Sequence, residues 1–579
     1  MSLACFRQGE AGTRMIGVVS KPTDADVVRE FFELFKTPWQ FYRDGMEYEI
    51  LLCIGQPPPP NIQASKLVVV YSAIGLPKEE KIGTAKYGES TLLYDGACIP
   101  LYCGCLRLEA AREQSSLVEK DSGSPVLGVE INDVRTIARI GYNLADEVRA
   151  LLTSGQPTAY AHIPAVELHI AVLRDLIVKS GAMLVEIPPI PDGFRFIACL
   201  THDVDHPSFR SHFLDHTLMG FLYRSVIGSI AQCWRGRMSY RKLLRNWIAA
   251  LRTPAVYLRL SADPWSNLEQ YTQLEEGLTS TFFFIPFKNR AGKLIGGDAP
   301  PRRAARYSAE EMSHTILALA KAGCEIGLHG INAWLDPSQA CAEKEQISKI
   351  TGARQIGSRM HWLYFASQSP AVLDSAAIDY DSTQGYNETI GYRVGTTQAY
   401  APLGVTRLLE LPMHIMDTAL FFPAHLNLSS HEAWKRVAGI IDNALTVGGC
   451  VTINWHDRSI APERLWGDFY VDLLQELRRH NAWITTAART VAWFRKRRSA
   501  EFRNLTAQSG EVRATVAVNP DDLPDLQVRV SSGEMEQTSI PLGAVLSCPG
   551  PAAKVERTIK IPFLASSRHT YVRSMAHQH

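Results

Sequence analysis

Residues 196–210 read FIACLTHDVDHPSFR, and this stretch decides our expectation of the fold. The run FIACL is typical of a buried strand, and it ends abruptly in His202, Asp203, Asp205 and His206. Titratable groups at the tip of a buried strand are costly to desolvate unless they bind something or each other. We therefore expect the end of this strand to open into a functional mouth.

The same pattern recurs through residues 194–497, where short apolar runs alternate with helix-like segments. The runs are FIACLTHD, STFFFIP, CEIGLHG, QIGSRMH, IDYDST, LLELPMH, CVTINWH and AWITTA. One intervening segment, SAEEMSHTILALAKAG, offers Ser308 as N-cap, Glu311 three residues later and Gly323 at its end. Strand–helix alternation predicts a parallel sheet, and eight such runs favour a distorted (β/α) barrel, closed or nearly closed, over an open sheet.

The ends of these runs carry polar residues in succession. In a (β/α) barrel the carboxyl ends of the strands form the active face. One polar tip can arise by chance, but a series at successive strand ends converges on one mouth. The residues at these ends are His202, Asp203, Asp205, His329, Arg359, His361, Asp381, His414, His456 and Asp457.

Two flanking regions differ in character from the barrel region. Residues 1–190 mix short strands, such as LVVVYSAI, with amphipathic helices, which predicts an N-terminal α/β domain of unknown role. The proline-rich stretch EIPPIPDG then predicts a linker. Residues 500–579 alternate at period two in VRATVAVNP, DLQVRVSS and VERTIKIPF, which predicts a small C-terminal β domain.

Residues 206–275 form a long insertion between the first two strands of the predicted barrel. The insertion is basic and aromatic, as in FRSHFLDHTLMGFLYRSV and CWRGRMSYRKLLRNW. A helix lying on a membrane surface fits this composition. We favour a helical cap over the barrel mouth, because the insertion leaves from the active face.

Composition narrows the class of protein. Among the 579 residues, 60 are Lys or Arg and 59 are Asp or Glu, so the net charge of +1 gives no whole-chain argument for a nucleic-acid partner or an anionic membrane. No uncharged apolar stretch reaches the roughly 18 residues of a transmembrane helix, and the N-terminus lacks the apolar core of a secretory signal. We therefore expect a cytoplasmic protein, whose oligomeric state the sequence does not predict.

Asp203 and Asp205 are spaced i, i+2, so on an extended strand both carboxylates point to the same side. Like charges so close are costly unless a cation joins them, in which case one carboxylate binds a metal and the other acts as a base. Capping at the strand end would explain one Asp, but not a pair flanked by His. His329, His361 and His456 follow later strands. Zinc accepts two His and one Asp and leaves a position for water.

Taken in order, these motifs resemble those of the polysaccharide deacetylase family, the NodB-homology domain of carbohydrate esterases. THDVD resembles the first motif, which implies Asp203 as general base and Asp205 as metal ligand. EIGLHG resembles the start of the second motif, with His329 as a ligand, and GSRMHW the third, in which Arg359 orients the base. YDST resembles the fourth motif and INWHD the fifth, with His456 as general acid. The resemblance covers residues 194–495 and implies a divalent metal ion, zinc first of all.

One departure from the family concerns the metal ligands. The second motif usually reads H-x-x-x-H, and its second His would fall on Ala333. Our hypothesis is that His361, from the next strand, supplies the third ligand instead. His202, His206 and His414 remain as rivals, although His202 points away from the side of the Asp pair on a regular strand.

The loop YDSTQGYNETIGYRVGTTQAY is rich in Gly and Thr and follows the fifth run. Its Tyr386 and Arg393 are candidates for substrate binding, since aromatic rings stack on sugar faces and Arg forks a carboxylate or a hydroxyl pair. A structural loop held by an ion pair between Asp381 and Arg393 is an equal alternative. Trp362 and Trp455 either form apolar walls around an acetyl methyl group or pack in the core.

The resemblance implies a metal-dependent hydrolase that removes an acetyl group, N-acetyl before O-acetyl, from a carbohydrate or glycan precursor. Two other classes stay open. One is a catalytically degenerate barrel that binds carbohydrate, which Ala333 favours, and the other is a metal-dependent amidase on a non-sugar substrate. Asp417, in ELPMHIMDTALFF, either lines the same mouth or caps the next helix.

Overall fold

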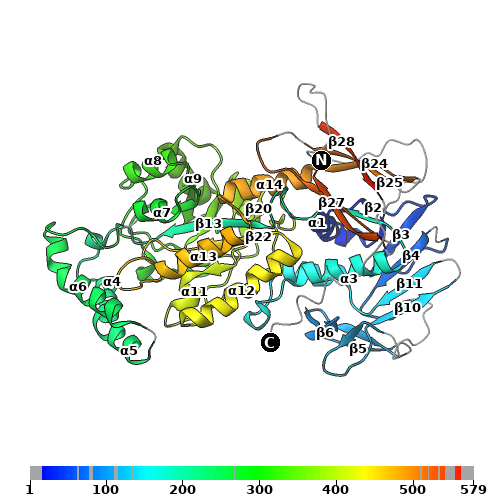
Figure 1. The fold of residues 1–579 in the computed structure, drawn as a ribbon, viewed down its shortest axis with the longest axis horizontal. Helices are drawn as coiled ribbons and strands as arrows, with labels where there is room; N and C mark the ends of the chain where they lie inside the picture. Colours follow the sequence, from blue (N-terminus) through cyan, green and yellow to red (C-terminus); the bar gives the residue numbers. More distant parts are fainter. Residues whose placement is uncertain are drawn as a thin grey trace.

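The structure is a computed structural model of the chain (Figure 1). Residues 1–15, which include most of the segment that led us to expect no secretory signal, lie outside the described residues. The described residues are 16–61, 64–76, 83–109, 115–132, 135–236, 238–266, 268–508, 511–518, 521–532, 535–541 and 555–562.

A parallel sheet of nine strands forms the middle of the molecule. Its hydrogen-bonded order is β20-β19-β18-β17-β14-β13-β22-β21, and β23 also pairs with β13. Every ladder in this sheet is parallel. The strands are β13 Ile197–Val204, β14 Thr281–Phe284, β17 Glu325–Gly330, β18 Ser358–Met360, β19 Tyr380–Asp381, β20 Leu409–Glu410, β21 Ile415–Met416, β22 Cys450–Asn454 and β23 Trp483–Thr485.

This topology confirms the expected distorted (β/α) barrel, with two differences in detail. All eight predicted runs contribute strands, and β21 is an additional strand of two residues. β23 pairs with the first half of β13 while β14 pairs with its second half, so these two strands divide one edge of β13 between them. No ladder joins β20 to β21 among the described residues, and the barrel therefore stays open on that side.

Helices flank the sheet, with α8 and α9 against β17, α12 against β22 and α14 against β13. α12 begins in a capping box made by Ser429 and Glu432. The helix expected after Ser308 starts at Ser313, because residues 309–312 form a turn first. The helices are α7 Leu268–Leu274, α8 Ser313–Lys321, α9 Pro337–Thr351, α10 Ser369–Ser375, α11 Asp417–Phe421, α12 Ser430–Val447, α13 Gly467–Arg479 and α14 Ala487–Ser499. Shorter elements of this region are β15 Lys293–Leu294, β16 Gly297–Asp298, η5 Pro301–Arg303 and η6 His361–Leu363.

The insertion after β13 is helical and stands at one end of the long axis of the molecule (Figure 1). Its helices pack against one another through α4, η4, α5 and α6. The elements are η3 Phe209–Ser211, α4 His216–Tyr223, the π-helix η4 Arg224–Gly228, α5 Ser229–Trp234 and α6 Tyr240–Tyr257.

The region before the barrel mixes strands and helices. Its main sheet has the order β10-β11-β4-β3-β1-β2, and two small antiparallel sheets, β5-β8 and β7-β6-β9, accompany it. The strands are β1 Ile16–Val19, β2 Trp39–Phe41, β3 Tyr48–Ile54, β4 Ala64–Tyr71, β5 Gly83–Lys86, β6 Ser90–Tyr94, β7 Ala97–Leu101, β8 Cys105–Leu108, β9 Leu117–Glu119, β10 Leu127–Ile131 and β11 Thr136–Ile140. The helices are η1 Pro22–Asp24, α1 Ala25–Phe35, α2 Leu144–Thr153, η2 Thr158–Tyr160 and α3 Ala165–Lys179.

The C-terminal strands form two antiparallel groups. β24 Glu501–Gln508, β25 Glu511–Val518 and β28 Val555–Pro562 make one sheet, in the order β24-β25-β28. β26 Gln527–Ser532 pairs with β27 Met535–Pro541 on one side and with β12 Leu184–Glu186 on the other. β12, which precedes the barrel in sequence, therefore joins the sheet formed by β26 and β27, which follow the barrel.

Arg497, near the end of α14, is buried and ties distant segments together. Its guanidinium donates to the carbonyl oxygens of Ile187, Glu33 and Leu34 at 2.9, 3.1 and 3.0 Å. It also donates to Oε1 of Gln398 at 3.0 Å. One side chain thus satisfies acceptors from the N-terminal region, the barrel and the segment between them.

The described part of the chain has no helix that combines the length and the apolar character needed to span a bilayer.

Candidate metal and catalytic site

The predicted polar residues gather at the carboxyl ends of β13, β17, β18 and β22. Parallel pairing brings these ends to one edge of the sheet, and the register places His329 opposite Arg359 on neighbouring strands. Asp203 belongs to β13 and Asp205 follows its last residue, whereas His456 lies two residues beyond the end of β22. The structure therefore brings these predicted residues to one edge of the sheet, which we call the mouth.

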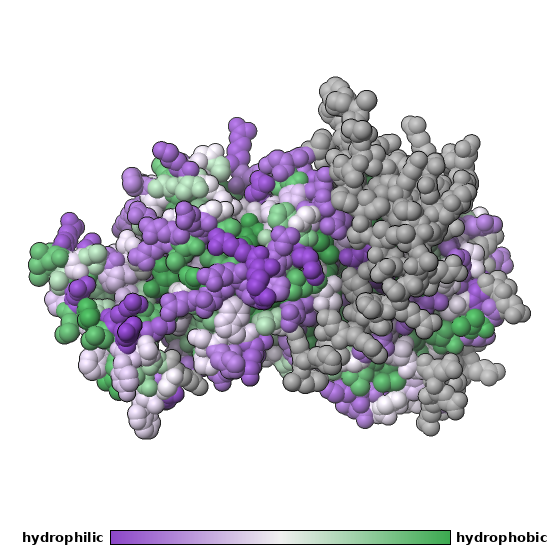
Figure 2. Space-filling view, viewed as in Figure 1, coloured by the Kyte–Doolittle hydropathy of each residue, from purple (hydrophilic) through white to green (hydrophobic). Residues whose placement is uncertain are grey.

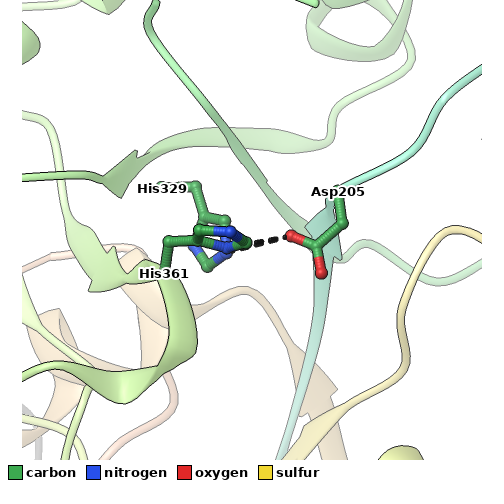
Figure 3. Close-up of side chains that lie close together, drawn as sticks. All are labelled: Asp205, His329 and His361. Atoms are coloured by element: carbon green, nitrogen blue, oxygen red, sulfur yellow. Dashed lines mark hydrogen bonds and ion pairs between the residues drawn. The ribbon is translucent and has the colours of Figure 1, made fainter. Parts of the chain in front are cut away.

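Asp205, His329 and His361 form a compact group, with one potential ligand atom from each within 4.8 Å of the others. Oδ1 of Asp205 lies 3.3 Å from Nε2 of His329 and 3.2 Å from Nδ1 of His361. The two ring nitrogens are 3.1 Å apart. Figure 3 shows both imidazoles facing the carboxylate from the opposite side of this small gap.

The outer hydrogen bonds of the two rings decide their tautomers. Nδ1 of His329 lies 3.0 Å from the carbonyl oxygen of Arg359, and Nε2 of His361 lies 3.0 Å from the carbonyl oxygen of Arg303. A carbonyl oxygen only accepts, so both of these nitrogens carry a proton. In the neutral rings, the two nitrogens that face Asp205 therefore carry lone pairs.

The donor set fits a divalent metal ion. Oδ1 of Asp205 is buried and has no hydrogen-bond donor among the described residues, and two nitrogen lone pairs point at the same place. Three electron-rich atoms held together repel one another unless a cation lies between them. One carboxylate oxygen and two imidazole nitrogens suit zinc, and the backbone carbonyls behind the rings fix their orientation.

Asp203 is held in place by two neighbours. Nη1 of Arg359 donates to its Oδ1 at 3.0 Å, and Nδ2 of Asn454 donates to its Oδ2 at 2.8 Å. Arg359 is itself fully buried and fixed by Thr201 and Ser382. Burial alone would raise the pKa of Asp203, but the guanidinium of Arg359 holds that pKa below its usual value. Asp203 is therefore an ionised, oriented carboxylate at neutral pH.

His456 stands on the other side of Asp205 and is supported by Asp417. Its Nδ1 lies 2.6 Å from Oδ1 of Asp417, and its backbone N–H donates to Oδ2 at 2.7 Å. Ser459 also donates its hydroxyl to Asp417. Nε2 of His456 lies 3.9 Å from Oδ2 of Asp205. Burial alone would lower the pKa of His456, yet Asp417, Asp205 and Asp203 together raise it to about 9.

The site is partly open to solvent. The side chains of Asp205 and His456 are 18% and 13% exposed, whereas that of Asp203 is 4% exposed. Asp457 is buried beside them, where its Oδ2 accepts the backbone N–H of His206 at 2.8 Å. Burial, reinforced by Asp205, raises the pKa of Asp457 to about 6. Asp205 and His456 are thus accessible to solvent, whereas Asp203 is almost fully buried.

The three rival histidines have other partners. His202 uses both nitrogens, with Nδ1 2.8 Å from the carbonyl oxygen of Trp455 and Nε2 2.8 Å from Oε1 of Glu275. His414 also uses both, since Nε2 meets the carbonyl oxygen of Thr396 at 3.1 Å and Nδ1 accepts the N–H of Thr452 at 3.1 Å.

His206 pairs with a residue of the insertion instead of the metal-binding group. Its Nδ1 lies 3.1 Å from Nε2 of His212. Of the four candidates for the third ligand, the structure brings only His361 into the group with Asp205 and His329 among the described residues. Ala333 is buried in the core and offers no ligand atom there.

The predicted substrate residues are placed unevenly. Trp362 is partly exposed in the turn after β18, with its ring centroid 5.9 Å from that of His361. Trp455 is fully buried and stacks on Tyr470, so its side chain packs in the core and is not offered to a ligand.

Tyr386 and Arg393 contact the N-terminal region. The hydroxyl of Tyr386 donates to the carbonyl oxygen of Gln156 at 2.6 Å, and Nη1 of Arg393 donates to the same oxygen at 3.0 Å. Among the described residues, these two side chains link the loop to the segment at Gln156, and Arg393 does not form the expected ion pair with Asp381. Asp381 bonds instead to Ser358 and Thr383. Substrate binding by Tyr386 and Arg393 stays a prediction.

Three supporting residues were not predicted in their roles: Asn454, Ser459 and the backbone of Arg303. Asn454 lies two residues before His456, so its side chain could have been assigned to the same face of the strand end. Asp417 was noted at the mouth, but its pairing with His456 was not. The contribution of Arg303 is a carbonyl oxygen, for which sequence carries no signal.

Comparisons with known proteins yield matches among solved structures only. No family model and no curated protein matches the chain. A candidate polysaccharide deacetylase from Mycobacterium smegmatis is 18% identical, with 56% of this chain and 100% of that chain covered and a TM-score of 0.33. The structure of Agd3, described as a novel carbohydrate deacetylase, is 9% identical over 95% and 98% of the two chains, with a TM-score of 0.38. PdaA of Bacillus subtilis, a family 4 carbohydrate esterase, is 11% identical over 56% and 89%, with a TM-score of 0.25.

Proposed function

We propose that the protein is a metal-dependent hydrolase that removes the acetyl group from an N-acetylated sugar. One observation carries this proposal. Asp205, His329 and His361 form a group that fits a divalent metal. Oδ2 of the ionised carboxylate Asp203 lies 4.0 Å from Nε2 of His329, and Nε2 of the imidazole His456 lies 3.9 Å from Oδ2 of Asp205. A base and an acid on two sides of a metal site are the parts that amide hydrolysis needs.

Asp205, His329 and His361 would hold the metal ion, with zinc the best match to their donor atoms. When bound, such an ion supplies Lewis-acid chemistry, polarising a carbonyl group and making a water molecule more acidic. The carbonyl oxygens of Arg359 and Arg303 keep the two rings in the tautomers that binding requires.

Asp203 acts as the general base. Arg359 and Asn454 each donate to one of its oxygens and fix the plane of the carboxylate. Because the pKa of Asp203 lies below its usual value, the carboxylate is ionised at neutral pH and accepts the proton of the attacking water. Arg359 is a positioning residue here, since it is fully buried and acts by donating to Asp203.

His456 acts as the general acid. Asp417 raises the pKa of His456, which favours the protonated ring, and it accepts the Nδ1 proton, which leaves the Nε2 proton facing the mouth. Water oxygen bonds to the acetyl carbon, the carbon–nitrogen bond breaks, and the Nε2 proton moves to the departing nitrogen. The products are acetate and an amino sugar.

Two observations support the choice of an N-acetyl sugar. An amine leaves a tetrahedral intermediate only after its nitrogen is protonated, and His456 offers that proton. Trp362 is partly exposed beside His361, where an aromatic ring can pack against a sugar face. The solved structures similar to this chain include proteins described as polysaccharide and carbohydrate deacetylases.

The test combines elemental metal analysis with release of acetate from a panel of N-acetylated sugars and acylated non-sugar amines. We expect about one equivalent of zinc in the wild type and in Asp298→Ala, an exposed control, and a loss of both metal and activity in Asp205→Ala and His361→Ala. Metal retained in His361→Ala would remove that residue from the group. Activity on the non-sugar amines alone would make the protein an amidase, and bound metal without turnover on any substrate would make it a binding protein.

A further inference from the structure

The insertion carries a surface that the proposed hydrolase chemistry does not use. We define the insertion hairpin as residues 213–260, which form α4, η4, α5 and α6 at one end of the molecule (Figure 1). Its inner side packs on a small core with Phe209 and Trp265. Among the described residues of the hairpin, Leu218, Phe221 and Val256 alone belong to the buried part of that core. Most of the apolar side chains of the hairpin are therefore not part of this buried core.

Most of the large apolar side chains described in the hairpin are exposed. The described residues include 23 exposed large hydrophobic side chains, and 15 of these belong to the hairpin. Such a concentration differs from the scattered apolar residues of an ordinary surface and marks a contact face. The fifteen are Phe213, Leu214, Met219, Tyr223, Val226, Ile227, Ile230, Trp234, Tyr240, Leu244, Trp247, Ile248, Leu251, Leu258 and Leu260. Figure 2 shows apolar and hydrophilic groups interspersed at this end of the molecule.

The charge of the hairpin is one-sided, although the whole chain is balanced. Residues 213–260 contain eight Arg or Lys and a single acidic residue, Asp215. The carboxylate of Asp215 is already engaged, because it caps α4 through the N–H groups of Thr217 and Leu218 and contacts His212. Lys242 pairs with Asp468 of α13. Arg235, Arg241, Arg245, Arg252 and Arg259 are exposed.

The exposed apolar and basic side chains of the hairpin indicate the chemistry of the partner that this face contacts. Exposed Trp, Tyr, Leu and Ile side chains interleaved with Arg and almost without acidic residues match the boundary between acyl chains and anionic headgroups. Trp234 and Tyr240 are 90% and 81% exposed. Aromatic residues that lie among lipid headgroups when bound are expected to be exposed in the protein without lipid. We propose that the insertion hairpin docks the protein onto an anionic lipid bilayer surface, lying in the interface without crossing it.

This proposal is independent of the proposed hydrolysis, because no residue of the hairpin belongs to the metal-binding group or contacts Asp203 or His456 by an interaction that the structure shows. The hairpin does begin close to the site in sequence, since it follows β13 and Asp205. Failure of one proposal therefore leaves the other standing, and the experiment below needs no substrate.

The experiment is co-flotation of the full-length protein with lipid vesicles. One set is phosphatidylcholine alone, and the other is phosphatidylcholine and phosphatidylglycerol at roughly two to one. We expect the wild type to float with the anionic vesicles at about 0.05 M salt, to bind the neutral ones at least about tenfold more weakly, and to weaken at about 0.5 M salt. A wild type that stays in the protein fraction with anionic vesicles at low salt would overturn the proposal.

Two sets of variants separate the contributions of the face. The double variant Trp234→Ser, Leu251→Ser removes apolar contacts, and Arg241→Glu with Arg245→Glu and Arg252→Glu reverses the charge. Each should lower binding to anionic vesicles at least about tenfold. The matched control, Tyr87→Ser with Ile131→Ser, changes two equally exposed side chains before the barrel and should bind like the wild type.

All the changed side chains are on the surface, so thermal unfolding should confirm that the variants stay folded. An equal loss in the control would contradict a specific docking face. Concentration-dependent dimers that Trp234→Ser, Leu251→Ser abolishes, without binding to either vesicle, would assign the face to a second copy of the chain and overturn the proposal.

Discussion

Two pairs of buried histidines occupy neighbouring regions of the sheet and differ in one respect. In His329 and His361, at the mouth, one ring nitrogen bonds to a backbone carbonyl oxygen and the other faces Asp205. His202, in β13, and His414, just before β21, bond through both nitrogens to protein partners. All four are at most 5% exposed.

The difference teaches that neither burial nor position at a strand end makes a histidine a ligand. What matters is whether the fold leaves one nitrogen without a partner and aims it at another electron-rich atom. His414 marks the opposite case, since burial lowers its pKa to about 4 and keeps it a neutral structural group.

The largest difference in metal affinity and activity should be seen when one histidine of each pair is replaced by Gln. His361→Gln should lower the metal affinity at least about a hundredfold and reduce activity to background, because it removes a ligand atom. His414→Gln, a matched change at a doubly bonded histidine, should keep the metal. Metal titration of both purified variants measures the difference, and equal losses in the two would show that the comparison has no functional meaning.

The next effect concerns the acid on the far side of Asp205. His456→Gln should keep the metal ion but lower kcat by about 10²–10⁴-fold, because proton transfer to the leaving nitrogen is lost while the metal-binding group stays intact. Parallel metal analysis and steady-state kinetics check this. A His456 variant that lost its metal would instead place the residue among the ligands.

A smaller effect should follow from loosening the base. Asn454→Ala removes the N–H that donates to Oδ2 of Asp203 at 2.8 Å, and we expect kcat to fall about tenfold with the metal retained. Asn443→Ala in α12 removes an amide that bonds to the carbonyl oxygen of His162, and it serves as control. If both variants had wild-type kcat, the support that Asn454 gives to Asp203 would be dispensable for the reaction.

The smallest effect is on stability and uses His414 again. Above about pH 6.5, the ring of His414 is neutral in both the folded and the unfolded chain. As the pH falls below this value, His414 is protonated in the unfolded chain, whereas in the folded chain it stays neutral down to about pH 4. Between about pH 7 and pH 5 the wild type should lose about 2 kcal/mol of unfolding free energy that His414→Gln does not lose. Urea unfolding at the two pH values measures it, and parallel pH dependence in both proteins would contradict the assignment.

The sequence predicted the strands, the polar edge and the grouping of Asp205, His329 and His361. This was feasible because strand period and residue type decide which side chains reach a strand end. The choice of His361 over His414 could only be a hypothesis, since it depends on which backbone carbonyl meets each ring.

Other placements depended on segments distant in sequence. Tyr386 and Arg393 bond to the carbonyl oxygen of Gln156, more than two hundred residues away, as the separations of 230 and 237 residues show. Trp455 is buried because α13 supplies Phe469 and Tyr470 to stack on it. No local pattern contains this information, because it arises from the packing of whole elements.

The buried Arg497 has a consequence for how this architecture can be divided. Its four acceptors come from α1, the segment before the barrel and the loop after Tyr386, while β12 lends an edge to β26. If the barrel were expressed without the preceding residues, Arg497 would lose three of its four acceptors, the carbonyl oxygens of Glu33, Leu34 and Ile187. Its guanidinium, whose charged form burial already disfavours, would then lack these hydrogen bonds. We therefore expect the barrel to keep its stability only together with the segments that supply these acceptors and this strand edge.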